Sequence, residues 1–200
     1  MEAHHLSAFI KAVFDDLEAR DTFPITIVRN ISIQIISRLQ FALAEENLGA
    51  AFLEDPLLWE QVIGAPSFCV LREVVLNYFA QVAQELSQKK EQHYWKIAEQ
   101  IVNYIEDHYS EEITLKTIAS KFYYSPNHLG VLFKEVTGKT FHDYLTQVRM
   151  RVAAQLLKEG SMYVYEVANR VSYKNTIAFS NQLRREFGVK PAEYSARYRR

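Results

Sequence analysis

The C-terminal half of the sequence nearly repeats itself once. Residues 118–144 (IASKFYYSPNHLGVLFKEVTGKTFHDY) match residues 167–194 (VANRVSYKNTIAFSNQLRREFGVKPAEY), and the second copy carries one extra residue. The paired positions are Ala119 with Ala168, Leu129 with Phe179, Phe133 with Leu183, Lys134 with Arg184, Gly138 with Gly188 and Tyr144 with Tyr194. An internal repeat means that one supersecondary unit is built twice, so the fold must accommodate two copies of a small unit.

Each copy predicts a helix, a tight turn and a second helix. In the first copy an apolar face precedes Tyr123 and Tyr124, which we assign to the turn. Ser125, followed by Pro126, is a typical helix start, and Gly138 is a typical helix end. The second copy has Asn175 and Gly188 at the corresponding places. The large apolar residues after each turn recur at helical spacing and are expected in the core.

A third helix is predicted between the two copies, over residues 141–159. Thr140 and Asp143 form a capping-box pattern at its start, and Gly160 follows its end. About 18 helical residues at ~1.5 Å each span ~27 Å, close to the ~34 Å turn of duplex DNA. If the second helices of the two copies are held that far apart, they can enter successive major grooves on one face of a duplex.

The N-terminal half predicts further helices. Apolar residues recur at helical spacing over residues 6–17, 71–86 and 95–109. Residues 24–45 alternate like a strand but also fit a mostly buried helix, which we favour, and breakers enclose a short element near residues 57–63. The fold class is therefore all-α, with an N-terminal helical domain and a C-terminal domain of two helix-turn-helix units joined by a connecting helix.

The charge is divided unequally between the two halves. Residues 1–92 carry seven Lys/Arg against thirteen Asp/Glu, whereas residues 93–200 carry sixteen against eleven, and the net charge from Thr114 onward is +9. This asymmetry is typical of a nucleic-acid-binding half beside an acidic half. We place the domain boundary in residues 87–93, a polar stretch without Gly or Pro that fits a helical bridge or a flexible linker.

Several classes of protein lack support in the sequence. The single cysteine, Cys69, excludes a disulfide framework and is expected to be a buried, inert thiol. The six histidines lie on different elements, and neither a HExxH motif nor a glycine-rich phosphate loop occurs. We therefore expect no catalytic residues, no metal site and no cofactor. Without a signal or membrane-spanning segment, the expected location is the cytoplasm.

Three segments carry a resemblance to a known family. SPNHLGVLFKEVTGKTFHDYL, RMRVAAQLL and AFSNQLRREFGVKPAEYSARYR, in that order, resemble the AraC family of bacterial transcription regulators over about half of the chain. The resemblance implies paired helix-turn-helix units whose second helices read bases. At Val131 many members carry Arg or another long polar residue, so base reading by the first unit rests on Asn127 and on apolar contact with thymine methyls. Residues 1–92 resemble, less specifically, the helical segment of YesN-type response regulators.

The expected DNA contacts lie on the second helix of each unit and beside its start. Base contacts are expected from Asn127, Gly130, Val131, Thr176, Ile177, Ser180 and Asn181. Phosphate contacts are expected from Ser125, Lys134, Lys174, Arg184 and Arg185.

The interpretation is a sequence-specific DNA-binding transcription regulator, not an enzyme, that reads an asymmetric promoter site. Its expected partners are double-stranded DNA, a second copy of the chain, an upstream receiver or sensor module and RNA polymerase, with no membrane. Residues 1–92 are expected to act in dimerisation or signal coupling. Either the chain is the effector part of a longer response regulator, or this half is itself the input module. The alternative function is a signalling adaptor that binds DNA only weakly.

Overall fold

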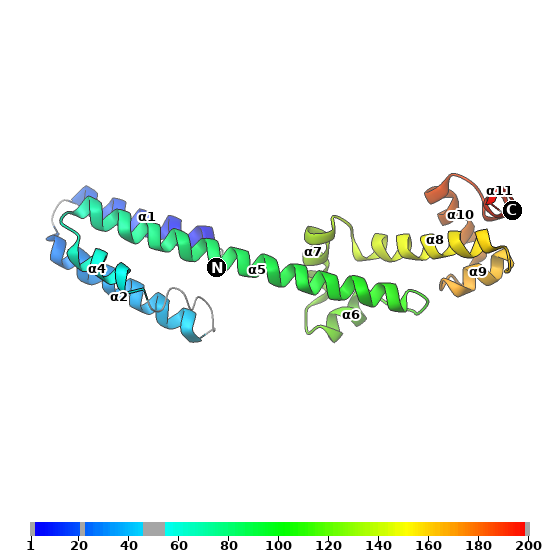
Figure 1. The fold of residues 1–200 in the computed structure, drawn as a ribbon, viewed down its shortest axis with the longest axis horizontal. Coiled ribbons are helices and arrows are strands. Elements are labelled where there is room, and N and C mark those ends of the chain that lie inside the picture. The colour runs from blue at the N-terminus through cyan, green and yellow to red at the C-terminus, as the bar shows by residue number, and fades with distance from the viewer. Residues whose placement is uncertain (1–2, 21–22, 46–54, 199–200) are drawn as a thin grey trace. The chain divides into compact units, whose positions relative to one another are not determined.

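The computed structural model describes residues 3–20, 23–45 and 55–198, and all regular structure in these ranges is helical, without a strand (Figure 1). The predicted all-α class is confirmed. The chain divides into two compact units, Met1–Gln92 and His93–Arg200. No helix in the described ranges has the length and hydropathy needed to cross a bilayer.

The N-terminal unit contains α1 (Ala3–Arg20), α2 (Ile25–Glu45), α4 (Pro56–Gly64) and the first part of α5 (Phe68–His108). Asp55 begins α4 by accepting the amides of the second and third helical residues at 3.0 and 3.3 Å. Side chains from all four helices form one apolar core.

Helix α2 resolves the ambiguity of residues 24–45. The helical interpretation is confirmed, since the buried side chains Val28, Ser32 and Ile36 recur every fourth residue. The expectation of a mostly buried helix is wrong. Ile27 is 44% exposed and Phe41 is 66% exposed, because only one stripe of α2 faces the core.

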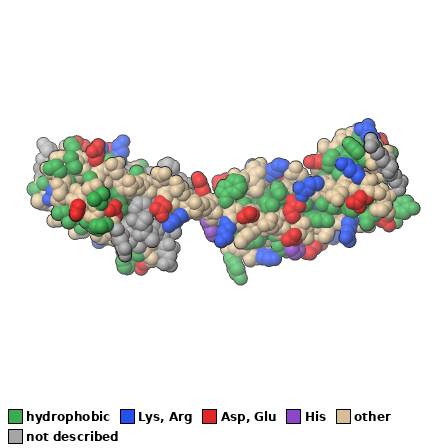
Figure 2. Space-filling model, viewed as in Figure 1, with side chains coloured by type: hydrophobic (Ala, Val, Ile, Leu, Met, Phe, Trp, Pro, Cys, Tyr) green, Lys and Arg blue, Asp and Glu red, His purple; other side chains and the backbone are tan. Residues whose placement is uncertain are grey.

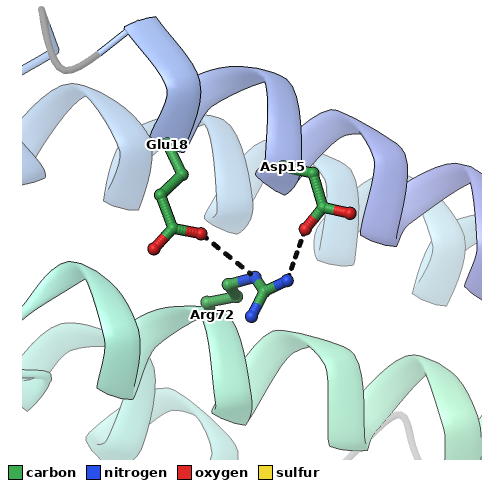
Figure 3. A network of polar contacts seen from close by, with 3 residues as sticks. All are labelled: Asp15, Glu18 and Arg72. Carbon is green, nitrogen blue, oxygen red and sulfur yellow. Dashed lines mark hydrogen bonds and ion pairs between the residues drawn. The ribbon is translucent and has the colours of Figure 1, made fainter.

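An ion-pair network ties α5 to α1 within the N-terminal unit (Figure 3). The guanidinium of Arg72 contacts the carboxylate of Asp15, and its Nε lies 4.0 Å from Oε2 of Glu18. The Arg72 side chain is 30% exposed, whereas both acidic side chains are about half exposed. A partly solvated pair of this kind stabilises the fold only modestly.

Helix α5 is continuous over 41 residues. It runs through residues 87–93, so this polar stretch is helical. Cys69 is exposed, contrary to expectation, because it lies two residues, or ~200° of helix rotation, from buried Leu71. Trp95 also departs from its predicted apolar stripe and is 63% exposed, whereas Ile101 and Ile105 are fully buried.

The C-terminal unit contains the rest of α5 and six further helices among the described residues. They are α6 (Leu115–Lys121), α7 (Pro126–Thr137), α8 (Phe141–Glu159), α9 (Val164–Arg170), α10 (Thr176–Phe187) and α11 (Pro191–Tyr198). Helices α6 and α7 lie at one end of α8, and α9, α10 and α11 lie at the other (Figure 1).

Helix α8 contributes side chains to two separate cores. Phe141, Leu145 and Val148 pack into the core of α5, α6 and α7. Met150, Ala153, Ala154 and Leu157 pack into the core of α9, α10 and α11. The predicted caps of α8 are confirmed: Thr140 accepts the amide of Asp143 at 3.2 Å, and Gly160 ends the helix.

Candidate nucleic-acid interface

The turns of the two units have the same backbone geometry. Tyr123 and Ser172 occupy the left-handed region at φ 59° and 61°. In the first turn the amide of Tyr124 donates to the carbonyl of Ala119 at 2.9 Å. In the second turn the amide of Tyr173 donates to the carbonyl of Ala168, also at 2.9 Å. The repeat seen in the sequence is therefore also a repeat of backbone hydrogen bonds, which sets how each second helix leaves its turn.

The second helix of each unit begins at the predicted cap. Oγ of Ser125 accepts the amide of His128 at 3.2 Å. Oδ1 of Asn175 accepts the amides of Ile177 and Ala178 at 2.8 and 3.2 Å. Both helices end at a glycine in the left-handed region, at φ 73° and 76°. These bonds fix the start and end of α7 and α10 in equivalent places.

One face of α7 and one face of α10 are buried by equivalent residues. Leu129 and Phe133 on α7, and Phe179 and Leu183 on α10, are all 0% exposed. The equivalent exposed positions are Asn127, Val131 and Lys134 on α7, and Ile177, Asn181 and Arg184 on α10. Because residues spaced by four and then three share one side of a helix, each triplet forms a continuous surface. We call these triplets the two reading faces.

Two expected base contacts lie toward the interior of their units. Gly130 is half-buried, and a Cβ added to it would lie 3.1 Å from Cδ2 of Leu115. Its lack of a side chain thus lets α6 and α7 approach closely. Ser180 occupies the equivalent position in α10 and is also half-buried. The Gly130 position therefore serves the packing of α6 against α7, and Ser180 lies at the equivalent place. Thr176, another expected base contact, is exposed at the start of α10.

The expected phosphate contacts differ in their surroundings. Lys134, Arg184 and Arg185 are exposed and form no ion pair with any described residue. Lys174 instead pairs with Glu112, in the loop before α6. Its hydrogen bond and positive charge lower the pKa of the Glu112 carboxyl. Lys174 is therefore partly neutralised in this structure, whereas the other three cations are available to an anionic ligand.

A hollow of about 700 Å³ opens beside the reading face of α7. It is lined by residues from the start of α6, the exposed side of α7 and the start of α8, among them Thr114, Asn127, Val131, Lys134, Phe141 and His142. Thr114 and His142 were not expected here. The Thr114-x-x-Thr117 spacing signals the cap of α6, but no sequence pattern brings it beside α7.

Arg149 binds the loop between α5 and α6. From α8, its Nε donates to the carbonyl of Tyr109 and its Nη2 to the carbonyl of Glu111, both at 2.8 Å. Burial lowers the pKa of Arg149. Burial also raises the pKa of Tyr173, which lies in the second turn. Arg149 thus binds two backbone carbonyls of the loop that follows α5.

Two side-chain hydrogen bonds connect α5 to α7 and to the turn before it. Nε2 of His93 lies 2.8 Å from the hydroxyl of Tyr124, and the hydroxyl of Tyr94 lies 3.2 Å from Nε2 of His128. The rings of Tyr124 and His128 also pack at 5.3 Å between centroids. The first turn of α7 is therefore positioned by α5 as well as by α6.

Positive side chains are more frequent over the C-terminal unit on the face shown in Figure 2. This agrees with the net charge of +9 from Thr114 onward. No group of three His, Cys, Asp or Glu side chains in the described part of the chain is arranged to hold a metal ion. The arrangement suits an extended polyanion, since phosphate contacts need only an approaching cation.

The two turns, their buried anchors and their exposed second helices define a protein with two helix-turn-helix units. A family model described as "Helix-turn-helix domain" matches residues 118–197. The chain is 31% identical to the C-terminal domain of AraT, a response regulator from Geobacillus stearothermophilus. That structural match has a TM-score of 0.51 and covers 52% of this chain and 87% of that one. The chain belongs to the AraC-type helix-turn-helix family, as the sequence resemblance predicted.

Two curated regulators extend the comparison. The regulatory protein SoxS of Escherichia coli is 29% identical over 102 residues, which are 51% of this chain and 95% of SoxS. The HTH-type transcriptional regulator YtdP of Bacillus subtilis is 27% identical over 192 residues. That match covers 94% of this chain, so it includes the N-terminal unit, and the chain spans 24% of the length of YtdP.

Proposed function

We propose that this chain is a sequence-specific DNA-binding transcription regulator that reads an asymmetric duplex site with α7 and α10. The observation that carries the proposal is the pair of reading faces. They occupy equivalent positions in two units joined by α8, whose 19 residues span ~28 Å. That length is close to one turn of duplex DNA, so the two helices would enter successive major grooves.

Selection of bound sites from a random duplex pool tests this function. Because the two reading faces differ in sequence, we expect two unlike contact blocks about 10 bp apart. The affinity for the selected duplex should exceed that for random duplex by roughly 10³ or more. A single short block contradicts the two-helix arrangement. A ratio near one favours the alternative function, a signalling adaptor that binds DNA weakly.

Two variants of α10 separate base reading from phosphate contact. Asn181→Ala should weaken binding to the selected site by ~1–3 kcal/mol and leave random duplex unchanged, since a bidentate base contact discriminates among bases. Arg184→Ala should weaken binding to both duplexes and lower the salt dependence by about one released counterion. Equal losses on both duplexes for Asn181→Ala would contradict its assignment as a base contact.

For the N-terminal unit we propose self-association. Its described surface carries large apolar side chains, including Phe9, Phe41, Leu57 and Ile63, which are each at least 60% exposed. Large exposed apolar side chains favour contact with a partner, and pairing would raise affinity for adjacent sites through effective concentration. Sedimentation of the full chain, with Phe41→Ser for comparison, tests this. A full chain that stays monomeric at high concentration favours reception of another module instead.

Further partners follow from the same proposal. An upstream receiver or sensor module is supported by the match to a domain of AraT, a response regulator, and RNA polymerase is the proposed target of regulation. A DNA target places the protein in the bacterial cytoplasm. The proposed role is non-enzymatic and needs no cofactor.

A further inference from the structure

Tyr163 and Tyr165 stand where the first unit carries Thr114 and Lys116. The equivalence follows from the repeat, in which residues before the turn are offset by 49 positions. Thr114 precedes α6 and Tyr163 precedes α9, each as the capping residue. The two units therefore place different side chains at the same backbone position, the start of the first helix of each unit.

This point borders the reading face. In the first unit, Thr114 lines the same hollow as Asn127, Val131 and Lys134 of α7. The second unit has the same left-handed turn residue, the same backbone hydrogen bond across the turn and the same buried anchors. By this equivalence we infer that the start of α9, with Tyr163, lies beside the reading face of α10.

The side chain of Tyr163 does not cap its helix, whereas the side chain of Thr114 does. The hydroxyl of Thr114 accepts the amide of Thr117 at 3.2 Å, whereas the side chain of Tyr163 makes no capping hydrogen bond. Its backbone amide donates to Oε2 of Glu166 at 2.7 Å, and its carbonyl accepts the amides of Glu166 and Val167, both at 3.0 Å. Since a Ser or Thr cap stabilises a helix, the tyrosine costs local stability.

The ring of Tyr163 is also displayed to solvent. It is 73% exposed and stacks on Tyr165, which is 55% exposed, with 5.9 Å between centroids and 10° between ring planes. The Tyr163 hydroxyl has no hydrogen-bond partner among the described residues. The Tyr165 hydroxyl reaches Oε1 of Glu166 only at 3.5 Å. Stacking on Tyr165 thus orders the exposed ring of Tyr163, whose hydroxyl is available as a hydrogen-bond donor.

We propose that Tyr163 is a further DNA-contact residue, whose hydroxyl donates to a backbone phosphate beside the half-site read by α10, and that Tyr165 positions it. This inference rests on the proposed function. Duplex DNA is the occupant because Tyr163 is equivalent to Thr114, which lines the hollow beside the reading face of α7. Tyrosine hydroxyls commonly contact phosphates, and they do so without displacing a counterion as a cation does.

The experiment measures affinity for the selected and random duplexes at several salt concentrations, together with the thermal midpoint. Tyr163→Phe keeps the ring and removes the hydroxyl, so we expect roughly three- to tenfold weaker binding to both duplexes with an unchanged salt slope. Tyr163→Thr should weaken binding at least as much while raising the thermal midpoint, because it restores the cap found at Thr114. Tyr123→Phe, a matched exposed tyrosine in the first turn, should bind as the wild type does.

Two outcomes overturn the inference. If both Tyr163 variants bind DNA as tightly as the wild type, which still selects its site, the contact is absent and the proposed function stands. Normal DNA binding with lost promoter activation would assign the ring to a protein partner and equally overturn the DNA contact. A wild type that does not prefer its selected site would overturn the proposed function itself.

Discussion

The two helix-turn-helix units agree at their buried positions and differ at their exposed ones. Leu129 and Phe179, at equivalent places, are both fully buried. On the exposed side, Val131 of α7 stands where α10 carries Asn181, and Thr114 stands where α9 is preceded by Tyr163. Packing restricts the buried residues of both copies in the same way, whereas the exposed residues are not restricted by packing and differ between the copies. The difference teaches that the two units share one scaffold and present different surfaces.

The largest expected effect tests the shared interior. Phe133→Ala and Leu183→Ala remove equivalent, fully buried side chains, so each should lower the free energy of unfolding by ~2–5 kcal/mol. Chemical denaturation measures both. Val131→Ala, at a 51% exposed position, is the control and should change stability little. A large loss at only one of the two buried positions would break the comparison.

Exchange of a reading face tests the different exteriors. The triple variant Asn127→Ile, Val131→Asn and Lys134→Arg gives α7 the reading face of α10. Site selection should then return two like contact blocks, with a preference of ~1–3 kcal/mol for each changed base pair. An unchanged first block would show that α7 does not determine sequence preference.

A smaller effect concerns the strained turn. Tyr123 is 97% exposed at φ 59°, so its ring contributes little packing while its backbone lies in a region that disfavours L side chains. Tyr123→Gly should raise the free energy of unfolding by ~1 kcal/mol. Thermal melting measures the change, with Tyr123→Ala as the control that keeps the strain. A lower melting temperature for Tyr123→Gly would mean that the ring has a stabilising contact.

The smallest effect concerns Lys174, the extra residue of the second turn. Lys174 lowers the pKa of Glu112, so this pair stabilises the fold above about pH 4.5, the ordinary pKa of the carboxyl. The contribution is lost as pH falls through the lowered value in the folded state. Lys174→Gln should raise the pKa of Glu112 toward its ordinary value, as followed by NMR titration. Identical titration curves in both proteins would mean that the pair does not form in solution.

Local patterns predicted the elements because their causes lie within a few residues. Ser125 and Asn175 cap α7 and α10 through amides two or three residues away, and a period of 3.6 residues identified the exposed Asn181. Contacts between distant segments were not predictable. Arg149 binds carbonyls 38 and 40 residues earlier, and the role of Gly130 depends on how closely Leu115 approaches.

The surface was harder to predict than the core. The apolar stripe that includes Trp95 has the correct period, yet its width on α5 is set by the helices that cover it. Tyr163 lies at a position where a capping residue is expected, but its sequence context does not reveal that its ring stacks on Tyr165. Such features become visible only when the two copies of the unit are compared in space.

The division of α8 between two cores has a consequence for folding. Val148 belongs to the first core and Met150 to the second, so the assignment changes within two residues of one helix. Neither helix-turn-helix unit can lose its core without exposing part of α8, and a frayed α8 weakens the packing of the other unit. The C-terminal unit should therefore unfold as one cooperative block, and amide hydrogens in α7 and α10 should exchange with solvent at matching rates governed by the same global opening.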